Sequence, residues 1–369
     1  MNLPKKIALF LPTLGGGGAE RVFVNLATEF ANLGHSVDLV VARPGGSLRG
    51  SVPPSVRVVD LGVKRVLQAL RPLARYLTAY RPDVLLSAME HANAIAFASR
   101  FVSRHSSLRL ICTTHNVMSN ATGTTKDRLL QKLSALVYRR VEGVVAVSEG
   151  VAADVSAHTG LSRQRITVIY NPVLSERLQE SARGPVDHPF LVNRDLPVVL
   201  ATGRLTEQKD YETLLRAVAI ARASRPLRLL ILGEGEQRRS LEAFAASLGI
   251  KDHVSMPGFT ANPYAYMCAA DVFALSSRWE GLPTVLIEAL GLGCKIVSTD
   301  CPSGPSEILD NGRFGELVRV GDANGLAAAI VRSLDSPTST PPASWLEQFT
   351  AHFCAGEYLR LMDAPRVQP

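Results

Sequence analysis

Residues 271–293, DVFALSSRWEGLPTVLIEALGLG, place an apolar run, a short polar loop and a helix start in direct succession. The apolar run ends at Ser277, and Pro283 opens the helical part. Proline is favoured at the first position of a helix because its missing N–H would have no partner there. The main-chain amides of residues 282–285 should therefore face a ligand at the helix start, where free donors and the helix dipole favour an anion.

The same alternation of strand and helix continues along the chain. Continuous apolar runs are typical of strands that are covered on both faces of a parallel sheet. They occupy residues 6–12, 36–42, 83–88, 108–114 and 143–148, and then residues 196–203, 227–233, 253–258, 271–277 and 294–300. The pattern predicts an α/β protein with two Rossmann-like, doubly wound domains that face a central cleft.

The polar stretch 179–194, which contains Pro and Gly, is the candidate linker. We expect an N-terminal domain over residues 1–185 and a C-terminal domain over residues 186–345. A final helical segment, 346–369, is expected to pack back on the first domain.

Composition limits the class of protein. The chain has 369 residues, 46% of them hydrophobic and 20% charged, which fits two folded domains and not a disordered chain. Its five cysteines form no CxxC pair, which argues against a disulfide framework and a zinc ribbon. The apolar stretch after Lys5 and Lys6 is shorter than the roughly 7–15 residues of an export signal. No window reaches the roughly 20 apolar residues of a membrane span. We expect a cytoplasmic protein.

The net charge of +7 is unevenly distributed. Residues 1–180 carry 22 Lys and Arg against 12 Asp and Glu, whereas the remainder carries 18 against 21. Residues 64–81 and 126–140 are basic, helical segments, and such segments can lie on anionic membranes. The alternative is two ordinary helices with solvated basic faces, and Pro72 is expected to break the first. We expect peripheral contact with the cytoplasmic face of an anionic inner membrane, and no nucleic-acid partner.

Two carboxylates flank the helix start at Pro283. Glu280 precedes it, and Glu288 follows eight residues after Glu280. Beside a bound diphosphate, one carboxylate would bind hydroxyls of a sugar and the other those of a ribose. The alternative is one buried glutamate satisfied by local amides and one solvated glutamate.

A pair of cations follows another strand in TGRLTEQKD, residues 202–210. Arg204 and Lys209 lie in a loop between strand and helix, where an α/β sheet binds its ligand. Two cations there can neutralise a diphosphate leaving group, and arginine can do so through two parallel hydrogen bonds. The alternative is two solvated loop cations.

The glycine run at residues 15–18 separates the first strand from the first helix, so backbone there can approach a ligand closely. The run departs from GxGxxG because Glu20 occupies the place of the last glycine. Arg43 could in principle meet the 2′-phosphate of NADP, which keeps a dinucleotide as a minor alternative.

His115, in ICTTHN, follows the strand at residues 108–114 and is expected to face the cleft. An imidazole there can bind a sugar hydroxyl or manage the proton of an acceptor. The alternative is a histidine that fixes a loop.

Taken together, these motifs resemble those of the retaining family 4 glycosyltransferases, which have the GT-B fold. The resemblance covers nearly the whole chain through GGAER, THN, VAVSEG, IYNPV, GRLTEQKD, LILGEGE, PGF, EGLPTVLIEALGLG and DCPSGPSEIL. The two glutamates spaced eight apart, combined with GRL and the following lysine, are fairly specific, whereas each shorter piece is not.

The resemblance implies that the N-terminal domain, residues 1–185, binds the acceptor and that the C-terminal domain, residues 186–345, binds the nucleotide sugar. It also implies a role for each matching position. Arg204 and Lys209 would hold the donor diphosphate, Glu280 the donor sugar and Glu288 the ribose. The remaining donor contacts would come from Gly281, Leu282, Pro283 and Thr284 to phosphate or sugar, from Gly235, Glu236 and Phe259 to the base, from Gly17 and Gly18 to the diphosphate, and from His115 to the sugar.

The resemblance also implies a reaction. A hexose or N-acetylhexosamine would pass from a UDP-sugar to a glycan acceptor, such as one linked to polyprenyl diphosphate, in cell-surface polysaccharide or glycoprotein glycan assembly. The anomeric configuration would be retained, with a β-phosphate oxygen taking the acceptor proton. The chain contains no Asp-x-Asp, so we expect neither a metal nor another cofactor. The alternatives are a nucleotide-sugar epimerase or phosphorylase on the same fold, and a partner that binds nucleotide sugar without turnover.

Overall fold

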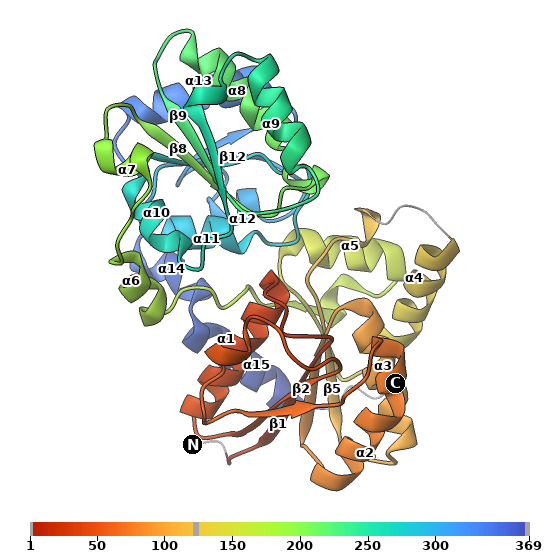
Figure 1. Cartoon of the computed structure of the whole chain (residues 1–369). Coiled ribbons are helices and arrows are strands. Elements are labelled where there is room, and N and C mark those ends of the chain that lie inside the picture. Colours follow the sequence, from red (N-terminus) through yellow and green to blue (C-terminus); the bar gives the residue numbers. More distant parts are fainter. Residues whose placement is uncertain (1–2, 121–124, 366–369) are drawn as a thin grey trace. The chain divides into compact units, whose positions relative to one another are not determined.

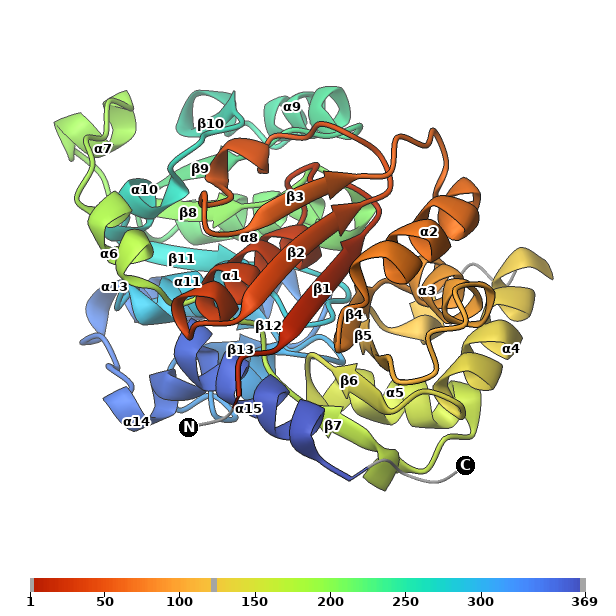
Figure 2. The same cartoon turned by 90° about the horizontal axis from the view of Figure 1, so that it is seen from below.

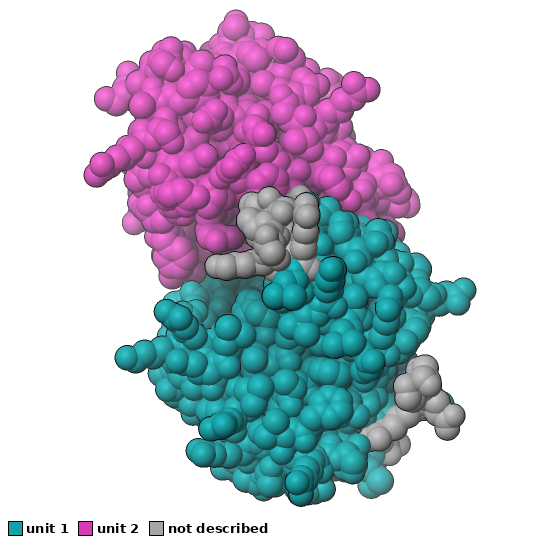
Figure 3. All heavy atoms as spheres, turned by 90° about the vertical axis from the view of Figure 1, so that its right-hand side faces the viewer, with its two compact units in different colours: residues 1–173, 348–369 teal, residues 174–347 magenta. Residues whose placement is uncertain are grey.

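In the computed structural model, which describes residues 3–120 and 125–365, the chain divides into two compact units (Figure 1). Unit 1 comprises residues 1–173 and 348–369, and unit 2 comprises residues 174–347 (Figure 3). The division falls ahead of the boundary expected at residue 185, because the helix α6 (Glu176–Ala182) packs against α10 (Pro263–Ala269) of unit 2.

Unit 1 contains a parallel sheet of seven strands among the described residues, in the order β3-β2-β1-β4-β5-β6-β7. The strands are β1 (Lys6–Leu11), β2 (Ser36–Val41), β3 (Arg57–Asp60), β4 (Val84–Ala88), β5 (Arg109–Thr114), β6 (Gly143–Ala146) and β7 (Ile166–Val168). The main helices are α1 (Gly18–Asn32), α2 (Leu70–Tyr80), α3 (Glu90–Val102), α4 (Thr125–Tyr138), α5 (Glu149–Thr159) and α15 (Ala351–Asp363). Helix α1 connects β1 to β2, in the direction of β3, whereas α2, α3, α4 and α5 lead to strands that follow one another in the direction of β7. Because crossovers between parallel strands are right-handed, α1 and the other four helices cover opposite faces of the sheet (Figure 2).

Unit 2 repeats this plan with a parallel sheet in the order β10-β9-β8-β11-β12-β13. Its strands are β8 (Val198–Thr202), β9 (Arg228–Leu232), β10 (Val254–Gly258), β11 (Val272–Leu275), β12 (Ile296–Thr299) and β13 (Glu316–Val318). Its further helices are α7 (Pro189–Asn193), α8 (Tyr211–Arg222), α9 (Arg238–Ser247), α11 (Thr284–Gly291), α12 (Pro305–Ile308), α13 (Ala323–Asp335) and α14 (Ala343–Leu346). The two doubly wound parallel sheets predicted from the sequence are confirmed.

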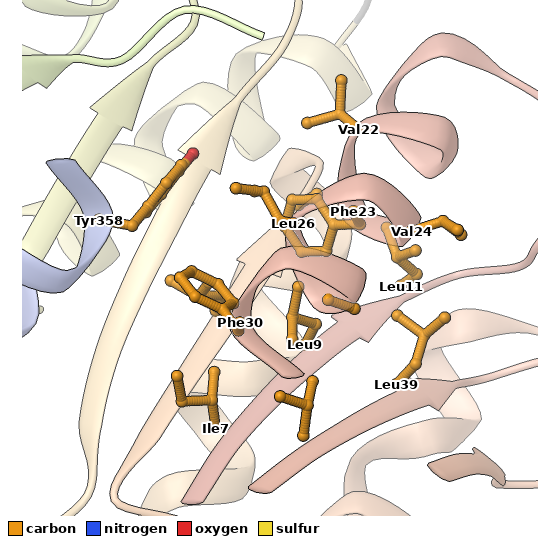
Figure 4. Close-up of a cluster of buried hydrophobic side chains, with 14 of the residues drawn as sticks. Ile7, Leu9, Leu11, Val22, Phe23, Val24, Leu26, Phe30, Leu39 and Tyr358 are labelled. Atoms are coloured by element: carbon orange, nitrogen blue, oxygen red, sulfur yellow. The ribbon is translucent and has the colours of Figure 1, made fainter. Parts of the chain in front are cut away.

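The last helix belongs to the core of unit 1. Phe30 of α1 meets Tyr358 of α15 edge to face, with ring centroids 6.5 Å apart, above the apolar side chains of β1 (Figure 4). Burying a side chain such as Phe30 contributes about 1.5–3 kcal/mol of transfer free energy. Arg109 of β5 donates hydrogen bonds of 2.6 Å to the carbonyls of Met362 and Ala364 at the end of α15. Residues 348–369 therefore complete the first domain, although they follow the second in sequence.

The helices of the described residues include none with the length and apolar character that crossing a bilayer requires.

Candidate active site

The central feature of unit 2 is the pair of neighbouring strands β8 and β11, where the strand order reverses. In open α/β sheets, ligands bind at the carboxyl ends of such a pair. The loop after β8 carries Arg204 and Lys209, and the loop after β11 carries Glu280. Residues some 70 positions apart in sequence are therefore brought to one edge of the sheet.

Lys209, which is partly buried, and Glu280, which is buried, form an ion pair. Lys209 Nζ lies 2.6 Å from Glu280 Oε1, and the same oxygen accepts a hydrogen bond of 2.7 Å from Ser277 Oγ. Gln208 Nε2 donates to the main-chain oxygen of Trp279 at 2.9 Å and lies 3.3 Å from the other carboxylate oxygen of Glu280. A lysine ammonium has three donors, so this pairing leaves Lys209 able to bind an anion as well. The carboxylate of Glu280 is held firmly in one orientation.

Arg204 differs from Lys209 because its side chain is exposed and has no ion pair or hydrogen bond among the described residues. It follows β8 directly, separated from the strand only by Gly203. A guanidinium without a partner at the carboxyl edge of the sheet is available to an anionic ligand through several N–H groups.

The start of α11 supplies main-chain donors. Pro283 is the residue that caps the helix and Thr284 is the first helical residue, one position later than the sequence suggested. The first amides bonded within the helix are those of Leu286 and Ile287, both to the carbonyl of Pro283. The amides of Thr284 and Val285 precede these bonds, so the helix start retains the anion-binding donors expected of it.

Glu288 lies one turn further along α11 and is buried. Tyr264 of α10 places its hydroxyl 3.4 Å from Glu288 Oε1. Both glutamates predicted for the site are therefore buried with polar neighbours, and neither is a solvated surface residue.

The residues expected near the base lie on the two adjacent loops of the same sheet edge. Gly235 and Glu236 follow β9, and Phe259 follows β10 with 77% of its surface exposed. The loop after β9 packs on the loop after β8 so closely that a Cβ on Gly233, whose φ is +149°, would lie 1.9 Å from the carbonyl oxygen of Gly203. Only glycine allows this approach.

The glycine loop of unit 1 is closed by an acidic residue. The buried carboxylate of Glu20 accepts a hydrogen bond from the amide of Gly17, and its other oxygen lies 3.0 Å from Thr13 Oγ1. The amide of Gly17 is therefore already engaged, whereas Gly18 begins α1. A carboxylate in this place also counts against a dinucleotide phosphate at the same helix start.

His115 lies at the carboxyl end of β5 in unit 1. Its Nε2 is 3.0 Å from Thr113 Oγ1, and the ring of Phe23 meets it edge to face at 6.0 Å. Burial lowers the pKa of His115 to about 4, so its imidazole is neutral near pH 7. A neutral imidazole can donate or accept one hydrogen bond at its free nitrogen.

Sequence reasoning missed the polar residues that hold Glu280 and its loop. They are Gln208, Ser277, Thr299 at the end of β12, and Ser303 in the turn after β12. Glutamines and serines in loops follow no periodic pattern, so only their position after predicted strands could have suggested them.

No group of three His, Cys, Asp or Glu side chains suited to a metal ion occurs in the part of the chain that the structure describes.

The arrangement can stabilise negative charge at one edge of unit 2. Within the described parts of the chain, it offers a guanidinium and main-chain amides that have no partner, and a partly engaged ammonium. These lie next to two carboxylates that can accept hydrogen bonds from hydroxyl groups. Two doubly wound domains, the second of which has an anion-binding site at the carboxyl edge of its sheet, are typical of the GT-B class of fold.

Comparison with known proteins agrees with this class. A model of "Glycosyltransferase Family 4" matches residues 16–177, and one of "Glycosyl transferases group 1" matches residues 196–336. The chain is 30% identical over 321 residues to the lipopolysaccharide core biosynthesis glycosyltransferase LpsE of Rhizobium meliloti, covering 85% of this chain and 84% of LpsE. This chain belongs to the family 4 glycosyltransferases.

Two further similarities extend over nearly all of the chain. It is 29% identical over 346 residues to the Campylobacter jejuni N-acetylgalactosamine-N,N'-diacetylbacillosaminyl-diphospho-undecaprenol 4-alpha-N-acetylgalactosaminyltransferase, covering 90% of each chain. Its fold matches that of Anabaena HepE, solved in complex with UDP, with a TM-score of 0.79 at 18% identity over 96% of this chain and 98% of HepE. The protein is thus a glycosyltransferase.

Proposed function

We propose that this glycosyltransferase moves a hexose or N-acetylhexosamine from a UDP-sugar to a glycan acceptor carried on polyprenyl diphosphate, in the assembly of a cell-surface glycan. The observation that carries the proposal is the collection of Arg204, Lys209 and the α11 start at one sheet edge. The name of the Campylobacter jejuni relative, which includes diphospho-undecaprenol, and the UDP bound to HepE support the choice of acceptor and donor.

In this proposal different residues of unit 2 bind different parts of the donor. Arg204 and Lys209 neutralise the diphosphate as the bond to the sugar breaks, and the amides at the α11 start bind its oxygens. Glu288 accepts hydrogen bonds from the ribose, and Glu280 accepts them from the sugar. Gly235, Glu236 and Phe259 lie against the base. Unit 1 binds the acceptor, with Gly18 and His115 at the carboxyl edge of its sheet.

The proposed reaction retains the anomeric configuration. The acceptor hydroxyl attacks from the face that the diphosphate leaves, and a β-phosphate oxygen of the leaving UDP takes the hydroxyl proton. The sugar–phosphate bond breaks as the new glycosidic bond forms. The fixed cations and amides of unit 2 would supply the charge stabilisation, so we propose that transfer needs no metal ion.

We also propose that the protein contacts an anionic membrane on the cytoplasmic side. Unit 1 exposes large apolar side chains on one set of helices, namely Leu67 before α2, Phe101 and Val102 at the end of α3, and Leu129, Leu133 and Leu136 on α4. Exposed cations lie on the same helices, including Arg71 and Arg75 on α2 and Lys132 on α4. Part of the expected basic segment at residues 126–140 lies outside the described side chains, which resume at residue 129.

The test of the donor site is the transfer rate of the Arg204→Ala variant with a UDP-sugar and a lipid-linked acceptor. Because Arg204 has no side-chain partner among the residues that the structure describes, its loss should leave stability unchanged while turnover falls by about 100-fold or more. Lys209→Ala should reduce turnover as well, but it also leaves Glu280 unpaired, so its effect mixes two causes.

Lys251→Ala is the matched control, since Lys251 is an exposed cation in the 3-10 turn before β10, at the opposite edge of the sheet. Turnover that survives in Arg204→Ala as well as in Lys251→Ala would overturn the diphosphate assignment.

Wild-type transfer should also persist in EDTA. Loss that is restored by added metal would refute the metal-free mechanism, and UDP binding without any transfer would favour a non-catalytic partner.

A further inference from the structure

The loop that carries Glu280 is held at both ends by hydroxyl groups, one from the end of β12 and one from the turn that follows it. Thr299 Oγ1, at the end of β12, donates to the main-chain oxygen of Ser277 at 2.7 Å. Ser303 Oγ, in the turn after β12, donates to the main-chain oxygen of Gly281 at 2.6 Å. Both hydroxyl-bearing side chains are buried, so solvent does not compete for these bonds.

These contacts fix the orientation of two peptide planes. A peptide group is planar and trans, so its N–H points away from its C=O. Thr299 holds the oxygen of the Ser277–Arg278 peptide, and the amide of Arg278 indeed points the other way, to the carbonyl of Gln208 at 2.8 Å. Gln208 lies beside Lys209 in the loop after β8.

The same geometry applies to the peptide between Gly281 and Leu282. Ser303 holds its oxygen, so the amide of Leu282 points away from the turn after β12. Among the described residues this amide has no acceptor. It lies immediately before the α11 start, where the amides of Thr284 and Val285 likewise have no acceptor in the described part of the chain.

The turn after β12 is shaped to make this contact. Gly304 has a φ of +97°, and a Cβ there would lie 2.5 Å from Pro283 Cδ and 3.2 Å from the Cα of Leu282. A larger residue would push the turn away from the Glu280 loop, so the glycine allows Ser303 to reach Gly281.

We propose that Ser303 is a positioning residue for transfer, which aims the Leu282 amide at the departing diphosphate by fixing the Gly281–Leu282 peptide. This inference rests on the proposed function, because it needs a diphosphate at the α11 start. Ser303 itself does not contact the donor. Its removal frees the peptide to rotate and misdirects one donor of a preorganised group, a kind of displacement that reduces rate without removing a catalytic side chain.

The experiment compares Ser303→Ala with Ser298→Ala. Ser298 is a buried serine on β12 whose hydroxyl donates to the carbonyl of Thr299 at 2.9 Å, so each variant removes a buried hydroxyl that donates to a main-chain carbonyl. Ser303→Ala should lower kcat by about tenfold or more and weaken UDP binding, measured by calorimetry, with the acceptor KM unchanged. Ser303→Thr keeps the hydroxyl and should recover most of the loss. Ser298→Ala should match the wild type in kcat and UDP affinity.

The outcomes separate this inference from the donor-site proposal. If Ser303→Ala and Ser298→Ala have equal kcat and UDP affinity while Arg204→Ala is inactive, Ser303 has no positioning role and the diphosphate site stands. If Ser303→Thr is as impaired as Ser303→Ala although both remain folded, the hydroxyl is not responsible and the inference is also overturned. If Arg204→Ala retains full transfer, the proposed donor site fails first.

Discussion

The carboxylate of Glu280 accepts from a lysine ammonium, a serine hydroxyl and a glutamine amide. The sequence predicted Glu280 and Lys209 at the same sheet edge, because both follow strands of one parallel sheet. It did not predict their ion pair, since Glu280 and Lys209 are 71 positions apart and no local pattern links them. Gln208, Ser277 and Ser303 were missed for the same reason.

His115 gives a prediction for the pH dependence of stability. Burial lowers its pKa to about 4 in the folded protein, below the ordinary value of 6.5 in an unfolded chain. Between these values the unfolded state binds a proton that the folded state does not, so the free energy of unfolding falls as the pH falls from about 6.5 to about 4. His115→Gln lacks this proton. Its stability should fall by about 1–2 kcal/mol less than that of the wild type between pH 7 and pH 5.

Chemical denaturation of the two proteins at both pH values measures this difference, and all other titrating groups cancel in the comparison. Identical pH dependence of the wild type and His115→Gln would show that the imidazole is not protected from protonation in the fold.

At the scale of elements, the strands predicted from apolar runs are confirmed, with ends shifted by one or two residues. The strands that were not predicted are β3, β7 and β13. All three lie at an edge of their sheet, and β7 and β13 are only three residues long. These three strands are half-buried, so they lack the continuous apolar run of a central strand. Pro72 does not break α2, because the helix begins at Leu70 and the proline lies in its first turn.

The helices of unit 1 give the prediction for membrane binding. The wild type should sediment with anionic liposomes at low salt and release at about 0.5 M salt, because screening weakens the attraction of the basic helices. Phe101→Glu, which changes a side chain that is 64% exposed at the end of α3, should bind less at low salt. Val192→Glu is the matched control, since Val192 is 59% exposed but lies on α7 in unit 2.

Absence of wild-type binding at low salt would contradict the membrane proposal. Equal losses in Phe101→Glu and Val192→Glu would show that the added negative charge acts on the whole protein and not on the α3 surface.

At the scale of the whole molecule, each unit has a helix from its C-terminal part that packs beside the helix that follows its first strand. In unit 2, α13 packs on α8, and in unit 1, α15 packs on α1. The second contact requires the chain to return to the first domain after completing the second. The sequence indicates that α15 has an apolar face, but it does not show which helix this face packs against, because Tyr358 lies more than 300 positions from its partner Phe30. That part of the architecture was therefore only an expectation.

The central claim is that unit 2 binds the donor diphosphate at the carboxyl ends of β8 and β11. A crystal structure of the protein with UDP tests it most directly. The account predicts diphosphate oxygens within hydrogen-bonding distance of the Arg204 guanidinium and the Leu282 amide, with the ribose hydroxyls at Glu288. A diphosphate bound away from the loops after β8 and β11, with Arg204 and Glu288 both untouched, would contradict it.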